Sequence, residues 1–319
     1  MTDDSHNEKE AAQPRTPLTL HMAWLLAAPH TWPAAIIPTL IAAACASTIT
    51  GTLSASLACA LLAICVLMQS SVNTFNDYFD YVKGSDSKDD DVDPSDAVLV
   101  YNNVNPRAAL ALAVGFLVAA FALGIYVIYR AGLVPLGIGV VGAIIVVAYS
   151  GGKTPISYLP IGEAISGIVM GGLIPLACFY SLTCTLRAEI IAWALPCMIG
   201  IALIMFTNNT CDIEKDVVAH RRTLSVLLGR ERARYAYHAL LYTWIVAIMA
   251  IIAWWFTSGL IVMPFMLLAA YPFIKALLEN PLASQTRIAA MTQICAVNVT
   301  LGAFYAAAIF ASGGTSLIW

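Results

Sequence analysis

The chain has 319 residues, of which 60% are hydrophobic and 11% charged, and its net charge at pH 7 is -3. Its mean hydropathy of +0.80 excludes an ordinary soluble domain. The bilayer core is about 30 Å thick and takes roughly 20 apolar residues per helix. The composition therefore predicts an all-α integral membrane protein, with lipids as its surroundings and no nucleic-acid partner, and we infer no protein partner from it.

The chain begins with the polar, acidic stretch MTDDSHNEKEAAQPR, which lacks the basic and apolar regions of a signal peptide. We interpret residues 1–20 as a disordered cytoplasmic tail. No linker divides the remainder, so residues 21–319 are predicted to form a single transmembrane domain. Nine apolar runs have the length of a membrane span, near residues 23–47, 53–72, 107–129, 132–150, 162–184, 188–207, 236–256, 259–278 and 288–311.

The basic residues indicate the orientation of these nine spans. With nine spans, every Lys and Arg except Arg130 and Arg187 falls on the side of the N-terminus. Positive charge accumulates in cytoplasmic loops. We therefore expect a multi-pass protein of the cell membrane, plasma or inner, with a cytoplasmic N-terminus.

A first polar cluster, NTFNDYFDYVKGSD at residues 73–86, directly follows the second apolar run. Residues three or four apart share one face of a helix. One stripe is therefore expected to carry Asn73, Asn76 or Asp77, and Asp80, with Asp86 just beyond the end of the helix. These side chains offer oxygen atoms at the cytoplasmic surface.

A second polar cluster, NNTCDIEKDVVAHRRT at residues 208–223, follows the sixth apolar run. Asn208, Asp212 and Asp216 stand at i, i+4 and i+8. The recurrence of such a cluster four spans later suggests two four-helix pseudo-repeats plus one added helix, arranged around a central cavity. The two clusters would then meet at the cytoplasmic mouth of that cavity.

Converging carboxylates repel one another unless a cation compensates them. Carboxylate and amide oxygens suit Mg²⁺, which protein carboxylates and substrate phosphates commonly bind together. Basic residues on the same side could hold the remaining phosphate oxygens. The sequence thus indicates an Mg²⁺-bound diphosphate, with cationic candidates Lys83, Lys153, Arg221 and Arg222.

A third segment, YSGGKTPISYLPIGE at residues 149–163, follows the fourth apolar run. It places Tyr149 and Lys153 at i, i+4 spacing beside the same membrane surface. A single interfacial lysine is also a common topology anchor. The segment alone leaves both interpretations open.

These three segments, together with APHTWPAAIIPTL at residues 28–40, resemble the UbiA-type aromatic prenyltransferases. Within that superfamily the chain is most similar to the 1,4-dihydroxy-2-naphthoate polyprenyltransferases of menaquinone biosynthesis. The resemblance implies nine helices around a cavity, two Mg²⁺ ions at its cytoplasmic end, and transfer of a polyprenyl group from polyprenyl diphosphate to an aromatic acceptor, with release of diphosphate.

The resemblance also implies roles for individual residues. It gives the metal candidates Asn76, Asp77, Asp80, Asp86, Asp212 and Asp216. The substrate-binding candidates are Lys83, Tyr149, Lys153, Asn208, Asn209 and Arg222, together with Arg221, which the topology places on the same side. Among these, the catalytic candidates are Asp80, Tyr149, Lys153, Asp212 and Asp216.

Three alternatives remain open from the sequence. The family often has Arg where this chain has Ala28 and Cys211, and the loop at residues 87–105 departs from the bacterial pattern, which allows a paralogue with another aromatic acceptor. The same departures allow a non-catalytic isoprenoid- or quinone-binding protein. A divalent-cation transporter is the third alternative, although its carboxylates would be expected near mid-membrane in interrupted spans.

Overall fold

The computed structural model describes residues 15–83, 98–150, 154–314 and 316–318, and most of them are helical. The first half of the chain contains α1 (Leu20–Leu26), α2 (Pro33–Thr50), α3 (Ala55–Lys83), α4 (Val98–Asn102), α5 (Pro106–Ala131) and α6 (Val134–Ser150). Its short strand β1 (Thr52–Ser54) pairs in parallel with β2 (Ser316–Ile318) near the C-terminus.

The second half contains α7 (Gly162–Ile168), α8 (Ile174–Thr183), α9 (Glu189–Cys211), α10 (Ile213–Val218), α11 (Leu224–Trp255), α12 (Met263–Glu279) and α13 (Arg287–Ala311). A π-helical turn at Val169–Leu173 joins α7 to α8. Short 3-10 turns lie at Pro29–Thr31, Ile156–Tyr158, Thr257–Val262 and Ser284–Thr286. The chain is therefore an all-α protein, as predicted.

Within the described residues, eight helical segments are long and apolar enough to cross a membrane. They correspond to every predicted span except the fourth, which coincides with the shorter apolar helix α6. The exact count of nine spans is thus not confirmed. The multi-pass membrane character is clear, and α5 carries outward apolar side chains that lipid would cover, including Val118, Phe121 and Ile125.

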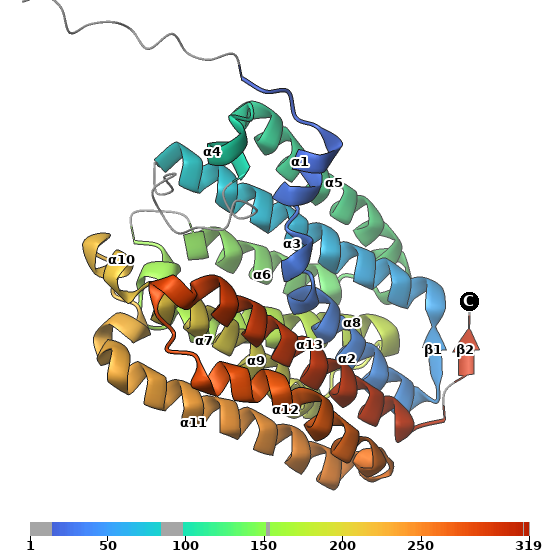
Figure 1. Ribbon diagram of the computed structural model, residues 1–319. Helices are drawn as coiled ribbons and strands as arrows, with labels where there is room; N and C mark the ends of the chain where they lie inside the picture. The colour runs from blue at the N-terminus through green and yellow to red at the C-terminus, as the bar shows by residue number, and fades with distance from the viewer. Residues whose placement is uncertain (1–14, 84–97, 151–153, 315, 319) are drawn as a thin grey trace, which may run out of the picture.

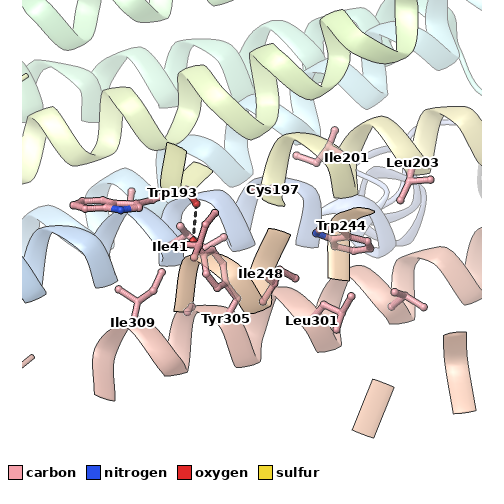
Figure 2. Close-up of a cluster of buried hydrophobic side chains, with 14 of the residues drawn as sticks. Ile41, Trp193, Cys197, Ile201, Leu203, Trp244, Ile248, Leu301, Tyr305 and Ile309 are labelled. Carbon is pink, nitrogen blue, oxygen red and sulfur yellow. Dashed lines mark hydrogen bonds between the residues drawn. The ribbon is translucent and has the colours of Figure 1, made fainter. Parts of the chain in front are cut away.

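The largest buried core lies where α2, α9, α11 and α13 pack together. Figure 2 shows Trp193 and Ile201 of α9 among side chains from the other three helices. In this core the Tyr305 hydroxyl of α13 donates a hydrogen bond of 2.9 Å to the carbonyl of Trp193. This buried bond satisfies a polar group where no water is available. The last span is thereby fixed against α9, which leads to the second polar cluster.

Glycines allow α9 to approach the segment from α7 to α8 very closely. A Cβ atom at Gly171 would lie 2.5 Å from the Cα of Met198, and one at Gly167 would lie 2.5 Å from the Met198 carbonyl oxygen. Small residues let helices pack backbone to backbone in membranes. This contact holds the beginning of α7 beside the end of α9.

The polar ends of the helices gather at one end of the bundle. In Figure 1 the C-terminal ends of α3, α6 and α9 and the N-terminal ends of α7, α11 and α13 lie toward the left, whereas β1, β2 and the C-terminus lie at the right. The predicted tail at residues 1–20 lies mostly outside the described residues. Thr16 is described, and its N–H donates a 3.0 Å hydrogen bond to the carbonyl of Asn103.

Candidate active site

The first polar cluster begins with Asn73, which holds α3 against the chain entering α2. The Asn73 amide donates to the Ala27 carbonyl at 3.0 Å and to the Thr31 hydroxyl at 2.8 Å. The Gln69 amide in turn donates to the Asn73 side-chain oxygen at 3.1 Å. Asn73, the first polar residue of the predicted stripe, therefore joins α3 to the segment before α2.

Asp77 holds the segment that begins α4. Its carboxylate accepts hydrogen bonds from the backbone N–H of Val98 at 2.7 Å and of Leu99 at 3.2 Å, and the residue is only 7% exposed. A carboxylate that accepts hydrogen bonds from the free N–H groups at the start of a helix is stabilised by the partial positive charge on their hydrogens. The metal assignment of Asp77 stays a prediction, and these bonds add a structural role that the sequence did not indicate.

Asn76 and Asp80 lie one helical turn apart on α3, and both are half-buried. Lys83 is the last residue of α3. Two other predicted site residues, Asp86 and Lys153, lie outside the described residues. Asn76 and Asp80 are thus the members of the first cluster whose position on α3 suits a role in the site.

The second polar cluster spans a bend in the chain. Helix α9 ends at Cys211, Asp212 has φ of -98° and ψ of 16°, and α10 begins at Ile213. Hydrogen bonds from Asp212 N to Asn208 O at 3.0 Å and from Asp216 N to Asp212 O at 2.8 Å continue the helical pattern through the bend. The predicted i, i+4, i+8 spacing is therefore preserved.

Arg287, the first residue of α13, binds two members of this cluster. Its Nε donates to Asp212 Oδ2 at 3.2 Å, and its Nη2 donates to Asn208 Oδ1 at 2.7 Å. The side chains of Arg287 and Asp212 are 16% and 18% exposed. A guanidinium in this position compensates a carboxylate that is largely removed from water. Sequence analysis placed Arg287 in a cytoplasmic loop but gave it no role.

Asp216 is balanced by a second arginine. The Asp216 carboxylate lies 3.5 Å from the Arg221 guanidinium and accepts a 3.2 Å hydrogen bond from the Thr223 hydroxyl. Burial raises the pKa of Asp216 from its ordinary 3.8 to about 6, and the nearby Asp212 carboxylate adds to this, although Arg221 opposes it. With Arg221 beside it, Asp216 is therefore mostly ionised at pH 7 and becomes protonated as the pH falls through about 6.

The loop after α10 docks on the segment before α7. The Arg221 guanidinium lies 4.7 Å above the ring centre of Tyr158. The backbone N–H of Arg222 donates a 2.8 Å hydrogen bond to the Tyr158 carbonyl. Cation–π contact and the backbone bond together fix the two loops. Arg222 itself has an exposed side chain. The predicted phosphate-binding arginines are thus held beside the second cluster.

Glu163 is a further acidic residue that sequence analysis did not assign. It is 4% exposed, and its Oε1 accepts a 2.8 Å hydrogen bond from the amide of Asn209. Tyr149, at the end of α6, is near, because a Cβ atom at Gly162 would lie 3.6 Å from the Tyr149 hydroxyl. The sequence does contain a sign of its importance, because Glu163 is a carboxylate at the beginning of an apolar run, where ionisable residues are rare.

Arg230 fixes the backbone around the second cluster. Its guanidinium binds both carboxylate oxygens of Glu214 at 2.8 and 2.7 Å, donates to the Thr210 carbonyl at 3.2 Å, and also reaches the Leu282 carbonyl. These contacts join the end of α9, α10 and the loop before α13. The position of Arg287 relative to Asp212 depends on this connection.

The donor atoms of the two clusters suit Mg²⁺, because they are carboxylate and amide oxygens. In the part of the chain that the structure describes, no three His, Cys, Asp or Glu side chains form a metal-binding group. Asp212 and Asp216 are instead compensated by Arg287 and Arg221. The described site is therefore an oxygen-rich cluster, and arginine side chains balance its negative charge.

The fold and the site together define the class of protein. It is a helical membrane protein with a cluster of acidic side chains, paired with arginines, at one end of its helical bundle. Residues 35–294 match the UbiA prenyltransferase family, and the chain belongs to that family. It is accordingly a prenyltransferase, and the resemblance seen in its motifs is confirmed.

Two relatives of this chain share one name with each other. The 1,4-dihydroxy-2-naphthoate octaprenyltransferase of Bacillus subtilis is 33% identical over 228 residues, covering 70% of this chain and 72% of that protein. The enzyme of that name from Mycobacterium tuberculosis is 29% identical over 216 residues, covering 66% of this chain and 72% of its own. The similarity thus extends over most of the membrane domain.

Solved structures support the same fold. A UbiA homolog from Archaeoglobus fulgidus bound to DMAPP and Mg²⁺ has a TM-score of 0.60 at 16% identity, covering 91% of this chain and 99% of that one. A UbiA homolog from Aeropyrum pernix has a TM-score of 0.61 at 16% identity, covering 91% of this chain and 96% of that one. At this level of identity the likeness concerns the fold.

Proposed function

We propose that this enzyme transfers a polyprenyl group from polyprenyl diphosphate to 1,4-dihydroxy-2-naphthoate and releases diphosphate, a step of menaquinone biosynthesis. The observation that carries the proposal is the arrangement of Asn208, Asp212 and Asp216 with Arg287 and Arg221. A balanced cluster of acids and cations suits a ligand that brings both metal ions and phosphate. The names of the bacterial relatives support the choice of acceptor.

Mg²⁺ is the proposed cofactor. Its leading ligands would be Asn76 and Asp80 from α3 together with Asp212 and Asp216 from the second cluster, with Asp77 and Asp86 as further candidates. When bound, Mg²⁺ would neutralise the negative charge that develops on departing diphosphate. The family neighbour bound to DMAPP and Mg²⁺ supports this assignment.

The cationic residues would hold the diphosphate oxygens that the metal leaves free. Candidates from the sequence are Lys83, Lys153, Arg221 and Arg222, together with the Tyr149 hydroxyl and the amides of Asn208 and Asn209. Arg287 joins them, since it already lies on Asp212 and Asn208. It brings a guanidinium to the position beside Cys211, where relatives often have an arginine.

The expected orientation places this site at the cytoplasmic surface of the cell membrane, with the prenyl tail among the spans and lipids. The polar ends of α3, α9 and α13 at one end of the bundle agree with a site on a single membrane side. A water-soluble acceptor and diphosphate would then exchange with the cytoplasm. The isoprenoid chain would remain in the apolar region.

A second aromatic acceptor is the main alternative within this enzyme class. The residues that favour it are Ala28 and Cys211, where relatives often have arginine. Membership of a prenyltransferase family gives no support to the transporter interpretation. The choice between acceptors depends on the product.

The test uses the full chain in nanodiscs with labelled polyprenyl diphosphate, Mg²⁺ and a panel of aromatic acceptors that includes 1,4-dihydroxy-2-naphthoate. Mass spectrometry should detect a prenylated naphthoate, and omission of Mg²⁺ should abolish it. A product formed only with another acceptor would replace the proposed substrate. Absence of any product from a folded protein would overturn the proposed function.

A further inference from the structure

Among the described residues, one carboxylate oxygen of Glu163 has a hydrogen-bond partner and the other has none. Oε1 accepts a hydrogen bond from Asn209, whereas Oε2 is shielded from solvent and has no hydrogen-bond partner in the described part of the chain. The residue as a whole is 4% exposed. A buried oxygen without a donor is costly, so its presence in a native protein calls for an explanation.

The surroundings of Glu163 belong to the candidate active site. Asn209 lies on α9 between Asn208 and the bend at Asp212. The Tyr149 hydroxyl faces the neighbouring residue Gly162. The Glu163 carboxylate therefore lies beside the second polar cluster, and the residue before it lies near the Tyr149 hydroxyl, on a helix that glycine packing fixes against α9.

The chemistry of this oxygen selects its ligand. A carboxylate oxygen accepts hydrogen bonds, so it would repel the oxygens of a diphosphate and attract a hydroxyl group. A ring hydroxyl of an aromatic acceptor provides such a donor. Hydrogen bonding to a carboxylate would also increase electron density on the ring, which favours attack by a ring carbon on an allylic cation.

We propose that Oε2 of Glu163 binds a ring hydroxyl of the aromatic acceptor, and that Oε1 positions Asn209 at the same time. This inference rests on the proposed function and names the side chain that would recognise a hydroxyl group of the acceptor. A site that bonds a substrate hydroxyl strongly rejects analogues that lack it. The enzyme should therefore discriminate against acceptors whose hydroxyl groups are methylated.

The decisive variant is Glu163→Gln, because glutamine keeps the side-chain oxygen that binds Asn209 and replaces the free oxygen by an NH₂ group. We expect the KM for 1,4-dihydroxy-2-naphthoate to rise about tenfold or more, as expected for a lost hydrogen bond to a charged group. The KM for polyprenyl diphosphate should stay unchanged. Glu189→Gln at the opposite, exposed end of α9 is the matched control.

A binding measurement separates this inference from the proposed function. Calorimetry with the full chain in nanodiscs should show tighter binding of 1,4-dihydroxynaphthalene than of its dimethyl ether, and Glu163→Gln should reduce that preference to near unity. Retention of the wild-type KM and of the wild-type preference by Glu163→Gln would overturn the inference. If the protein transfers no prenyl group but still shows this Glu163-dependent preference, the proposed function is refuted and the inference about Glu163 stands.

Discussion

The two polar clusters look alike in sequence, but the structure uses them differently. In the first cluster, Asn73 and Asp77 bind backbone and side-chain groups of the segment before α2 and of α4. In the second, Asp212 and Asp216 bind the guanidinium groups of Arg287 and Arg221. The first cluster therefore holds neighbouring segments of the chain in place. The second forms ion pairs between carboxylates and arginines.

This difference follows from the partners that tertiary packing supplies. Backbone N–H groups at the start of α4 are neutral donors that stay bound whatever ligand is present. Arginine side chains are mobile cations that can move from a carboxylate to a phosphate. We therefore expect the second cluster to rearrange when diphosphate and Mg²⁺ bind, and the contacts of Asp77 to remain.

The largest expected effect is loss of turnover when a leading metal residue is neutralised. Asp212→Asn and Asp80→Asn should each lower kcat/KM by about 10³-fold or more, because charge stabilisation in the transition state is lost. The measurement is product formation in nanodiscs, and exposed Glu279→Gln is the control. Activity within tenfold of wild type in Asp212→Asn would show that the second cluster does not act in the reaction.

Arg287→Gln tests whether the last helix contributes to the site. It removes the cation shared by Asp212 and Asn208, and we expect kcat/KM for polyprenyl diphosphate to fall about 10²-fold, comparable to removal of one electrostatic contact in an active site. Arg287→Lys should recover part of this loss. Exposed Arg187→Gln at the other end of the bundle is the control, and equal losses in both variants would contradict the assignment.

Asp77→Ala tests the structural side of the comparison. The change leaves two backbone N–H groups at the start of α4 without their acceptor, so the free energy of unfolding should fall by about 2 kcal/mol. Denaturant titration in detergent measures this loss. The Mg²⁺ concentration for half-maximal activity should change far less than in Asp80→Ala. The opposite pattern would make Asp77 a metal ligand.

The smallest expected effect concerns pH. Because burial raises the pKa of Asp216 to about 6, its stabilising contribution to the metal-free fold is complete below 3.8 and lost as the pH rises through about 6. Mg²⁺ requires the ionised carboxylate, so its apparent affinity should fall as the pH decreases from 7 to 5, by about tenfold per unit below the pKa.

Arg221→Gln sharpens that measurement. Arg221 lowers the pKa of Asp216, so its removal should move the midpoint of the affinity profile to higher pH. The profile comes from calorimetric titration with Mg²⁺ in the presence of diphosphate. A midpoint that is unchanged in this variant would separate the pH dependence from Asp216.

Periodicity and composition were sufficient for the helices and for the spacing within each cluster. The run from Asn208 to Asp216 keeps its four-residue steps even though the chain bends at Asp212, because the i, i+4 backbone bonds continue. The fourth predicted span, residues 132–150, coincides with helix α6 (Val134–Ser150).

The sequence by itself determined the membrane class, the two acidic clusters and the family, because these depend on local residue types and spacing. Only the tertiary structure decided which carboxylate meets which partner. Arg287 is 75 residues from Asp212, and Glu163 is 46 residues from Asn209. Such pairs are set by the packing of α7 and α13 against α9, and no local pattern encodes which distant side chain reaches a given oxygen.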